Sequence, residues 1–384
     1  MNSAVQVSRA MFGEEHRIFR DSARRFVEAH VVPHYVRWEK DGHVPRSFWR
    51  EAASAGLLCP SVPEEYGGPG GDYLFNVVVL EEIVRVGATG LGGISVHNDI
   101  VVPYFVDYAT EELKSRWLPK MVSGDAIGAI GMTEPSGGSD VKALRTTAKR
   151  DGDAYVIDGQ KTFITNGQCA DFVLLAAKTN PGAGAKGISL FVVEAARPGY
   201  RHGRQLDKIG QHAADTAELF FDSVRVPAGN LIGEEGKGFA YMMEKLPQER
   251  LAIAVIAVAQ AESAYRWTLD YVKQRTAFGR TIFEFQNTRF KLAEIAAEIA
   301  IGRVFIDNCT KAHLTGELDV PTAAMAKFWC TDMACRVIDE CVQLFGGYGY
   351  MREFPIARAW VDARVQRIYG GTNEIMKELV ARSL

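Results

Sequence analysis

The first third of the chain carries apolar residues at helical spacing. One face of the first such segment, which ends near Pro33, has five of them: Phe12, Phe19, Ala23, Phe26 and Val27. This spacing is typical of an amphipathic helix. Further helices are predicted over residues 48–53, 74–86, 94–108 and 111–121. The Pro- and Gly-rich stretch 60–71 interrupts the pattern, because these residues end regular elements. The pattern predicts an all-helical domain over residues 1–122.

The pattern of apolar and polar residues changes near residue 123, where short apolar or alternating runs replace the helical spacing. Turn signals such as Asp151-Gly152-Asp153 and Asp158-Gly159 separate these runs, and residues 181–187 are expected to form a surface loop. Runs of this length and spacing predict strands. They cover residues 126–132, 144–150, 154–157, 163–165, 172–178, 188–194 and 218–221. We therefore expect a β-sandwich or barrel domain over residues 123–235.

The helical pattern resumes at Gly236 and continues to Leu384. Loops are expected near residues 276–285, 316–321, 346–351 and 369–372, which leaves long helices for a C-terminal four-helix bundle over residues 236–384. Helices are thus followed by strands and then by helices again. That order predicts an α+β fold and not an alternating α/β one.

Composition narrows the function classes. Of 384 residues, 47% are apolar and 24% are charged, and the net charge is −3, which is typical of a soluble globular protein. The charge gives no basic surface for nucleic acid. The longest apolar runs, such as 252–259, are shorter than the roughly 20 residues of a membrane span. Residues 1–11 lack the pattern of a targeting peptide, so we expect a cytoplasmic protein, or a mitochondrial matrix protein only if the chain is a mature form.

Several tempting sites are excluded by their context. The six cysteines contain no C-x-x-C pair and the eight histidines are scattered, so we expect no metal site. The glycines of 346–349 follow no predicted strand, which argues against a dinucleotide-binding turn. The segment 233–238 lacks the spacing of a phosphate-binding loop.

One stretch places charge beside a buried helix. Glu249 and Arg250 come directly before the apolar run 252–259, at the head of a predicted helix. A carboxylate that faces an apolar cleft has a raised pKa suited to proton transfer. The alternative is an exposed first turn, where a Glu suits the helix dipole. From this stretch alone both interpretations stay open.

Longer strings identify a family. Met132-Thr133-Glu134-Pro135-Ser136-Gly137-Gly138-Ser139-Asp140 resembles the first signature of the acyl-CoA dehydrogenases. The segment Gln343–Tyr350, followed by Glu353, Arg358 and Asp362, resembles the second. Residues 161–167, 275–280 and 369–374 are also similar to family segments. Because the resemblance covers essentially the whole chain, the sequence is identified as a member of the acyl-CoA dehydrogenase family.

The resemblance implies FAD bound between the β domain and the C-terminal helices. Phe163 stands where many relatives have Trp, which keeps an aromatic wall but loses the indole donor. Arg275 and Gln286 would hold the dinucleotide of a neighbouring subunit's cofactor, and a guanidinium suits a pyrophosphate. The implied FAD contacts are Met132, Thr133, Ser139, Phe163, Ile164, Thr165, Arg275, Phe278, Gln286, Gln343, Leu344, Phe345, Gly346, Gly347, Thr372, Asn373 and Glu374.

The chain departs from the common family pattern at one position. Many relatives carry the catalytic Glu where this chain has Gly370, and glycine cannot accept a proton. A smaller group, similar to the long-chain and isovaleryl enzymes, places its base directly before an arginine, as Glu249 precedes Arg250. The resemblance therefore implies Glu249 as base. The implied substrate contacts are Ser139, Pro247, Gln248, Arg250, Tyr369, Gly370 and Gly371.

The resemblance also implies that the flavin ribityl hydroxyl and a backbone N–H at position 370 stabilise the developing enolate, and a backbone donor needs no side chain. The missing side chain at Gly370 is also expected to leave room for a long or branched acyl chain. The implied partners are an acyl-CoA thioester, an electron-transfer flavoprotein and further copies of the chain, in a homotetramer built as a dimer of dimers. The alternatives are an oxidase or flavin-dependent monooxygenase of the same superfamily, or an inactive binding relative.

Overall fold

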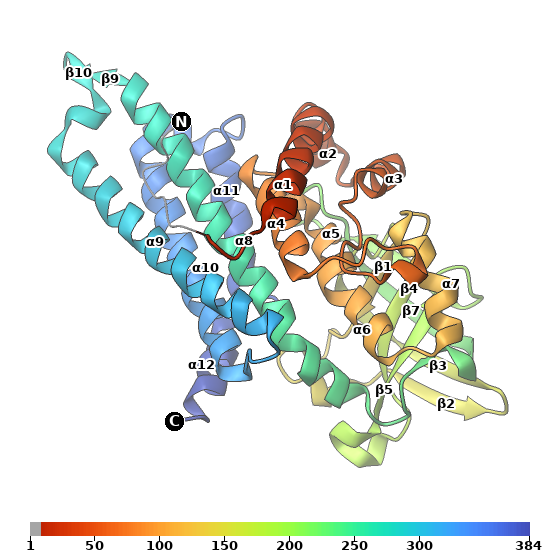
Figure 1. Ribbon diagram of the computed structural model, residues 1–384. Coiled ribbons are helices and arrows are strands. Elements are labelled where there is room, and N and C mark those ends of the chain that lie inside the picture. The colour runs from red at the N-terminus through yellow and green to blue at the C-terminus, as the bar shows by residue number, and fades with distance from the viewer. Residues whose placement is uncertain (1–8) are drawn as a thin grey trace.

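The computed structural model describes residues 9–384 and opens with a helical domain (Figure 1). Its helices are α1 (Glu14–Phe26), α2 (Tyr35–Asp41), α3 (Arg46–Ser54), α4 (Tyr73–Arg85), α5 (Gly92–Ser95), α6 (Val102–Tyr108) and α7 (Glu111–Val122). The predicted helix over residues 94–108 is divided, because a π-helical turn, Val96–Val101, separates α5 from α6. Helix α4 is buried on almost every face, so it forms the centre of this domain.

An eight-stranded sheet follows, with strand order β6-β7-β3-β2-β4-β5-β8 and β1 paired in parallel with β4. The strands are β1 (Gly128–Gly131), β2 (Thr147–Asp151), β3 (Ala154–Thr165), β4 (Phe172–Lys178), β5 (Ile188–Glu194), β6 (Tyr200–Gln205), β7 (Thr216–Pro227) and β8 (Leu231–Ile232). This confirms the β domain and the α+β fold, and corrects several strands.

The corrections have local physical causes. The runs 154–157 and 163–165 belong to one strand, β3, which passes Gly159 through an irregularity in its pairing with β7 instead of turning there. Strand β2 begins at Thr147 and not at residue 144, because residues 141–143 form a 3-10 turn. Strand β6 was not predicted, because its residues after Tyr200 are mostly exposed and give no apolar alternation. Strand β8 was not predicted either, because it has only two residues.

The sheet separates two hydrophobic cores. Alternate side chains of a strand point to opposite faces, and β4 shows this clearly. Phe172, Leu174 and Ala176 pack in the large core shared with the helices. Val173, Leu175 and Ala177 pack in a second core inside the β domain. Strand β4 therefore reads as a continuous apolar run, because both of its faces are covered.

The C-terminal domain consists of long packed helices: α8 (Gly238–Gln274), α9 (Gln286–Leu314), α10 (Val320–Phe345), α11 (Pro355–Ala363) and α12 (Asn373–Ala381). A hairpin of two short strands, β9 (Thr276–Ala277) and β10 (Arg280–Thr281), joins α8 to α9. Figure 1 places this hairpin at the far end of the bundle from the β domain. Residues 246–251 had been predicted at the head of a helix. Helix α8 begins at Gly238, so these residues lie about three turns inside it instead.

Within the described part of the chain, no helix is both long and apolar enough to cross a membrane. The six cysteines are free thiols, and four of them, Cys59, Cys309, Cys330 and Cys341, are buried. The expectation about a targeting peptide concerns residues 1–11, of which residues 1–8 lie outside the described residues.

Candidate active site

Glu249 is buried in the interior of α8. Its side chain is 6% exposed, so it is not the exposed first-turn residue of the alternative interpretation. Burial raises the pKa of Glu249 to about 7, although a hydrogen bond from Tyr104 and the nearby charge of Arg250 both oppose this shift. A carboxylate with this pKa can accept a proton near neutral pH.

Tyr104, on α6, positions the Glu249 carboxylate. Its hydroxyl donates to Oε1 of Glu249 over 3.1 Å, and the tyrosine itself is fully buried. The sequence analysis missed this residue, because a tyrosine in an apolar helical run is indistinguishable from an ordinary core residue. The contact joins the N-terminal domain to the C-terminal domain at the predicted base.

Replacing Tyr104 by Phe is expected to raise the pKa of Glu249 further, because the hydroxyl stabilises the ionised carboxylate. A hydrogen bond to a charged group contributes about 1.5 kcal/mol, which corresponds to about one pH unit. The acidic limb of the pH profile of kcat/KM should therefore move up by about one unit, and activity should recover at alkaline pH. Tyr108→Phe, one turn further along α6, is the matched control. An unchanged profile in Tyr104→Phe would show that this contact does not tune the base.

Arg250 is a buried cation whose guanidinium is not fully engaged by residues 9–384. It is 5% exposed, burial lowers its pKa, and its Nε has no hydrogen-bond partner within residues 9–384. A buried guanidinium with unused donors is costly. Arg250, which was predicted to contact substrate, is therefore available to an acceptor that the folded chain does not itself supply.

The loop Tyr369–Thr372 lies against α8 beside Arg250 and Ile253. Gly370 and Gly371 have φ angles of +66° and +90°, which disfavour other residues. A Cβ on Gly370 would lie 2.4 Å from Cδ1 of Ile253, one helical turn after Glu249, and a Cβ on Gly371 would lie 4.0 Å from Nη2 of Arg250. Ile253 thus occupies the space that the sequence analysis expected to be open beside Gly370.

The amide of Gly370 donates no hydrogen bond to any acceptor in residues 9–384. An unused N–H on the loop that faces this stretch of α8 can donate to an oxygen of a bound ligand. The structure thus brings the predicted base, the Arg250 guanidinium and the predicted backbone donor into one region.

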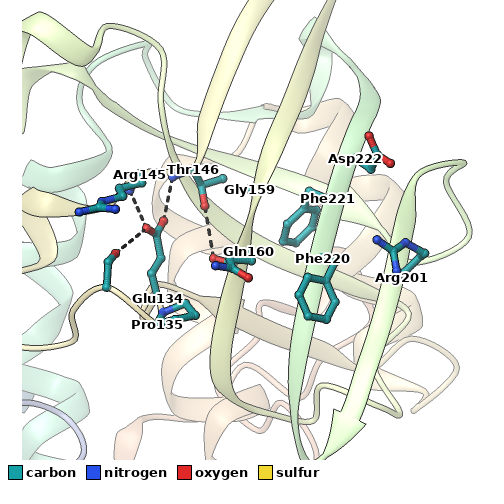
Figure 2. A pocket seen from close by; sticks show the side chains of 11 residues that line it. Glu134, Pro135, Arg145, Thr146, Gly159, Gln160, Arg201, Phe220, Phe221 and Asp222 are labelled. Carbon is teal, nitrogen blue, oxygen red and sulfur yellow. Dashed lines mark hydrogen bonds between the residues drawn. The ribbon is translucent and has the colours of Figure 1, made fainter.

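The first signature loop is fixed to β3 by a buried ion pair. Lys161 and Glu134 are 0% and 3% exposed in their side chains, with Nζ and Oε1 2.8 Å apart. Glu134 also accepts from the amides of Arg145 and Thr146 (Figure 2). In addition, the Thr162 amide donates to the carbonyl of Thr133 over 3.0 Å. These bonds hold Met132 and Thr133 beside the end of β3.

Phe163 is presented outward on this strand. Its side chain is 68% exposed, and its φ of +59° is rare for a residue with a side chain. The register between β3 and β7 shifts between Lys161 and Ile164, which turns Phe163 away from the sheet while Ile164 stays buried. An exposed aromatic held in a strained conformation is typical of a binding surface.

The pocket shown in Figure 2 is a different feature. It has a volume of about 350 Å³ and lies over β3, β6 and β7, next to the Glu134 loop. Its lining includes neither Glu249 nor Phe163. We therefore do not assign the predicted chemistry to it.

The residues predicted to hold the dinucleotide lie apart from Phe163. Arg275, Phe278 and Gln286 are exposed at the β9–β10 end of the bundle, and Phe278 is 94% exposed. Figure 1 places this end of the bundle away from the β domain that carries Phe163. That these residues serve a neighbouring subunit's cofactor stays a prediction.

Other predicted contact residues have roles in the fold. Gln248 donates its side-chain amide to the carbonyl of Asp99 over 3.0 Å. Thr372 caps α12, since its hydroxyl accepts from the amide of Ile375. Phe345 is buried and stacks on Tyr271, with ring centroids 4.2 Å apart. Pro247 lies inside α8, where it cannot donate a helix hydrogen bond. Their roles in binding ligands stay predictions, because these contacts serve the fold.

The remaining predicted residues differ in exposure. Glu374, Gln343, Gly346, Gly347 and Ser139 are exposed, whereas Met132, Thr133, Thr165 and Leu344 are partly buried. The residues near the end of β3 fit a flavin, because the exposed aromatic of Phe163 suits a ring system and the hydroxyl groups of Thr133 and Thr165 suit a ribityl chain. The exposed guanidinium of Arg275 suits a pyrophosphate, but it lies at the other end of the bundle. Among residues 9–384, no group of three His, Cys, Asp or Glu side chains is arranged to hold a metal ion.

Comparison with known proteins places the chain in a family. Residues 13–125, 129–224 and 236–384 match the N-terminal, middle and C-terminal domain models of acyl-CoA dehydrogenase, respectively. The mouse long-chain specific acyl-CoA dehydrogenase is 50% identical, covering 98% of this chain and 88% of that protein. The isovaleryl-CoA dehydrogenase of rice is 34% identical, covering 98% and 93%.

Solved structures agree. The acyl-CoA dehydrogenase of Geobacillus kaustophilus has a TM-score of 0.95 and 53% identity, covering 97% of this chain and 98% of that one. A chain in a structure of the electron transferring flavoprotein of Acidaminococcus fermentans has a TM-score of 0.94 and 36% identity, covering 97% and 98%. A glutaryl-CoA dehydrogenase of Mycobacterium smegmatis in complex with FADH2 has a TM-score of 0.91 and 26% identity, covering 97% and 95%. The chain therefore belongs to the acyl-CoA dehydrogenase family, whose reaction is the FAD-dependent dehydrogenation of an acyl-CoA thioester.

Proposed function

We propose that Glu249 is the base that removes the α-proton of a saturated acyl-CoA, which becomes the trans-2-enoyl-CoA. The observation that carries this assignment is a buried carboxyl with a pKa of about 7, on the stretch of α8 that contacts the loop whose Gly370 amide is unused. Gly370 itself has no side chain to act as a base. Glu249 supplies the proton acceptor that this chain lacks at position 370, where many relatives carry it.

The residues of the chain divide the work. Glu249 takes the α-proton, and the Gly370 amide donates to the thioester oxygen as negative charge develops there. A flavin held there would supply the acceptor for the hydride that leaves the β-carbon. The apolar surroundings of Glu249 exclude water, which keeps its pKa raised. Met132, Thr133, Phe163, Ile164 and Thr165 would hold the ring system.

The substrate is a long-chain or branched acyl-CoA. Support comes from the position of the base, which is the one the resemblance gives to the long-chain and isovaleryl enzymes. It also comes from the 50% identity to the mouse long-chain specific enzyme. The space for an acyl chain beside the loop Tyr369–Thr372 is limited by Ile253, although Gly370 has no side chain.

The proposed assembly is a homotetramer, a dimer of dimers, that passes electrons to an electron-transfer flavoprotein. Helix α9 exposes Phe290, Ile301 and Val304 by 57%, 60% and 54%, which gives it an apolar outer face suited to another copy. The separation of Arg275 from Phe163 also favours a second copy. The cytoplasmic location stays a prediction.

An anaerobic titration tests the proposed reaction. Palmitoyl-CoA or isovaleryl-CoA is expected to bleach the flavin absorbance of the FAD-loaded protein at near-stoichiometric amounts, and butyryl-CoA to bleach it less. The reduced, product-bound enzyme should then reoxidise slowly in air and rapidly with an electron-transfer flavoprotein. Rapid reoxidation in air would favour an oxidase or monooxygenase instead. Bound FAD that none of the three thioesters bleaches would contradict the proposed substrate class.

A further inference from the structure

The loop that carries the Gly370 amide is held from behind by α10. Lys327 is fully buried, and its Nζ donates to the Gly371 carbonyl over 2.7 Å and to Oδ1 of Asn373 over 2.9 Å. Lys327 thus links the second glycine of the loop to Asn373, the first residue of α12. The catalytic assignments leave it without a role.

Asn373 completes this support. Its amide nitrogen donates to Oγ1 of Thr331 and to Oδ1 of Asp332, each over 3.0 Å. Both acceptors belong to α10, within two turns after Lys327. The polar atoms of the Asn373 side chain are therefore engaged by the fold, and a cofactor contact at this residue would have to use its backbone.

The need for such support follows from the loop itself. Two consecutive glycines with positive φ have many accessible conformations, so the direction of the Gly370 amide is not fixed by local sterics. A backbone donor stabilises charge effectively only when it is preorganised. A displacement of about 1 Å at such a donor is enough to reduce a rate by about 10²-fold.

We propose that Lys327 is a positioning residue for the dehydrogenation. Lys327 holds the Gly371 carbonyl on one side of the two glycines, and the Tyr369 amide donates to the Val365 carbonyl over 3.1 Å on the other. Held at both ends, the Gly370 amide points in the direction needed to bind the thioester oxygen while Glu249 removes the α-proton. This inference rests on the proposed function of Glu249.

The charges around Lys327 give it a second effect. Burial and the nearby charge of Arg250 lower the pKa of Lys327 to about 7, whereas Asp332 and Glu374 favour its charged form and Arg367 disfavours it. The lysine cation and Arg250 both make the potential near the loop more positive, which favours a developing enolate. Loss of the lysine proton at alkaline pH should therefore slow proton abstraction without removing the hydrogen bonds of the neutral amine.

The test isolates the proton step. 3,3-Dimethylbutyryl-CoA has two α-hydrogens but no β-hydrogen, so the FAD-loaded enzyme in D₂O can exchange its α-protons without oxidising it. In Lys327→Met, exchange at saturating thioester is expected to fall at least about tenfold, while the half-saturating concentration changes less than about threefold. The alkaline decline of the exchange rate should disappear. Amide hydrogen exchange of the peptide 368–376 should accelerate in the variant, with or without thioester.

Matched variants separate the possible results. Glu249→Gln should abolish α-proton exchange of the thioester and leave the amide protection of peptide 368–376 intact. If α-proton exchange survives in Glu249→Gln, the proposed base is contradicted and the role of Lys327 is not. Lys327→Gln, which keeps a polar group, is measured if the Met variant does not fold. Lys291→Met, which removes a partly exposed lysine on α9, is the control for charge loss. If the Lys327 variants show the wild-type rate of α-proton exchange and the wild-type amide protection of peptide 368–376, the proposal is overturned.

Discussion

Glu249→Gln is expected to lower the rate of flavin reduction at least about 10³-fold, toward the upper range for loss of a general base. Glutamine keeps the size of the side chain and its acceptor for the Tyr104 hydroxyl, but it cannot take a proton. Anaerobic stopped-flow mixing with palmitoyl-CoA measures the effect directly. Glu244→Gln, an exposed carboxylate on the same helix, is the control and should reduce the flavin at the wild-type rate.

The pH dependence gives an independent check. Because Glu249 must be ionised to act, wild-type flavin reduction should rise with pH through about 7. Rapid bleaching in Glu249→Gln would place the base elsewhere. A variant that is slow at every pH, but still binds the thioester, would support the assignment.

Thermal stability distinguishes lost chemistry from lost folding. The folded-state pKa of Glu249 is raised, so the folded state holds its proton more tightly than the unfolded state does. Wild type therefore loses stability as pH rises from about 4.5 through about 7. Glutamine does not titrate, so Glu249→Gln should melt at a higher temperature than wild type above pH 7. The difference should shrink toward pH 4.

Much of the fold was predictable because its patterns are local. The helical spacing of α1 and the apolar runs of β4 and β5 identify elements that bury one or both faces. Strand β3 was divided in the sequence analysis because Asp158-Gly159 has the composition of a turn. Its pairing with β7 overrides that preference, since a long strand with partners on both sides gains more from the sheet than from turning.

The site was predictable only where its chemistry lies in motifs. Family resemblance located Glu249, the signature loop and the double glycine. Tyr104 and Lys327 come from helices in which a tyrosine or a lysine signals nothing by itself. Tyr104 acts across two domains, over 145 residues of sequence, and Lys327 acts within the C-terminal domain, over 44 residues. Such contacts depend on how the helices pack, which no local pattern encodes.

A buried ion network joins the N-terminal segment to the bundle. Glu81 of α4 is 6% exposed and contacts Arg9, Arg20 and Arg303, at 2.8, 2.8 and 2.7 Å. Burial disfavours its charge, but Arg303, Arg9 and Arg20 outweigh this effect and hold the pKa of Glu81 well below its usual range. One carboxylate thus compensates part of the charge of three guanidinium groups, of which Arg303 belongs to α9.

Glu81→Gln is expected to destabilise the protein by about 3 kcal/mol, the lower end for breaking a buried ion pair. The loss stays at the lower end because Asp307, Glu82 and Glu262 still contact the three arginines. The loss should be present above about pH 4.5 and shrink as the pH falls further, since the depressed pKa of Glu81 adds stability only where the unfolded carboxyl is ionised. Urea unfolding at several pH values measures it. In the double variant Glu81→Gln/Arg303→Met, part of the loss should be recovered, because one of the cations that lost a carboxylate partner is also removed. Additive losses would show that Glu81 and Arg303 do not form an energetically coupled pair, despite their separation of 2.7 Å.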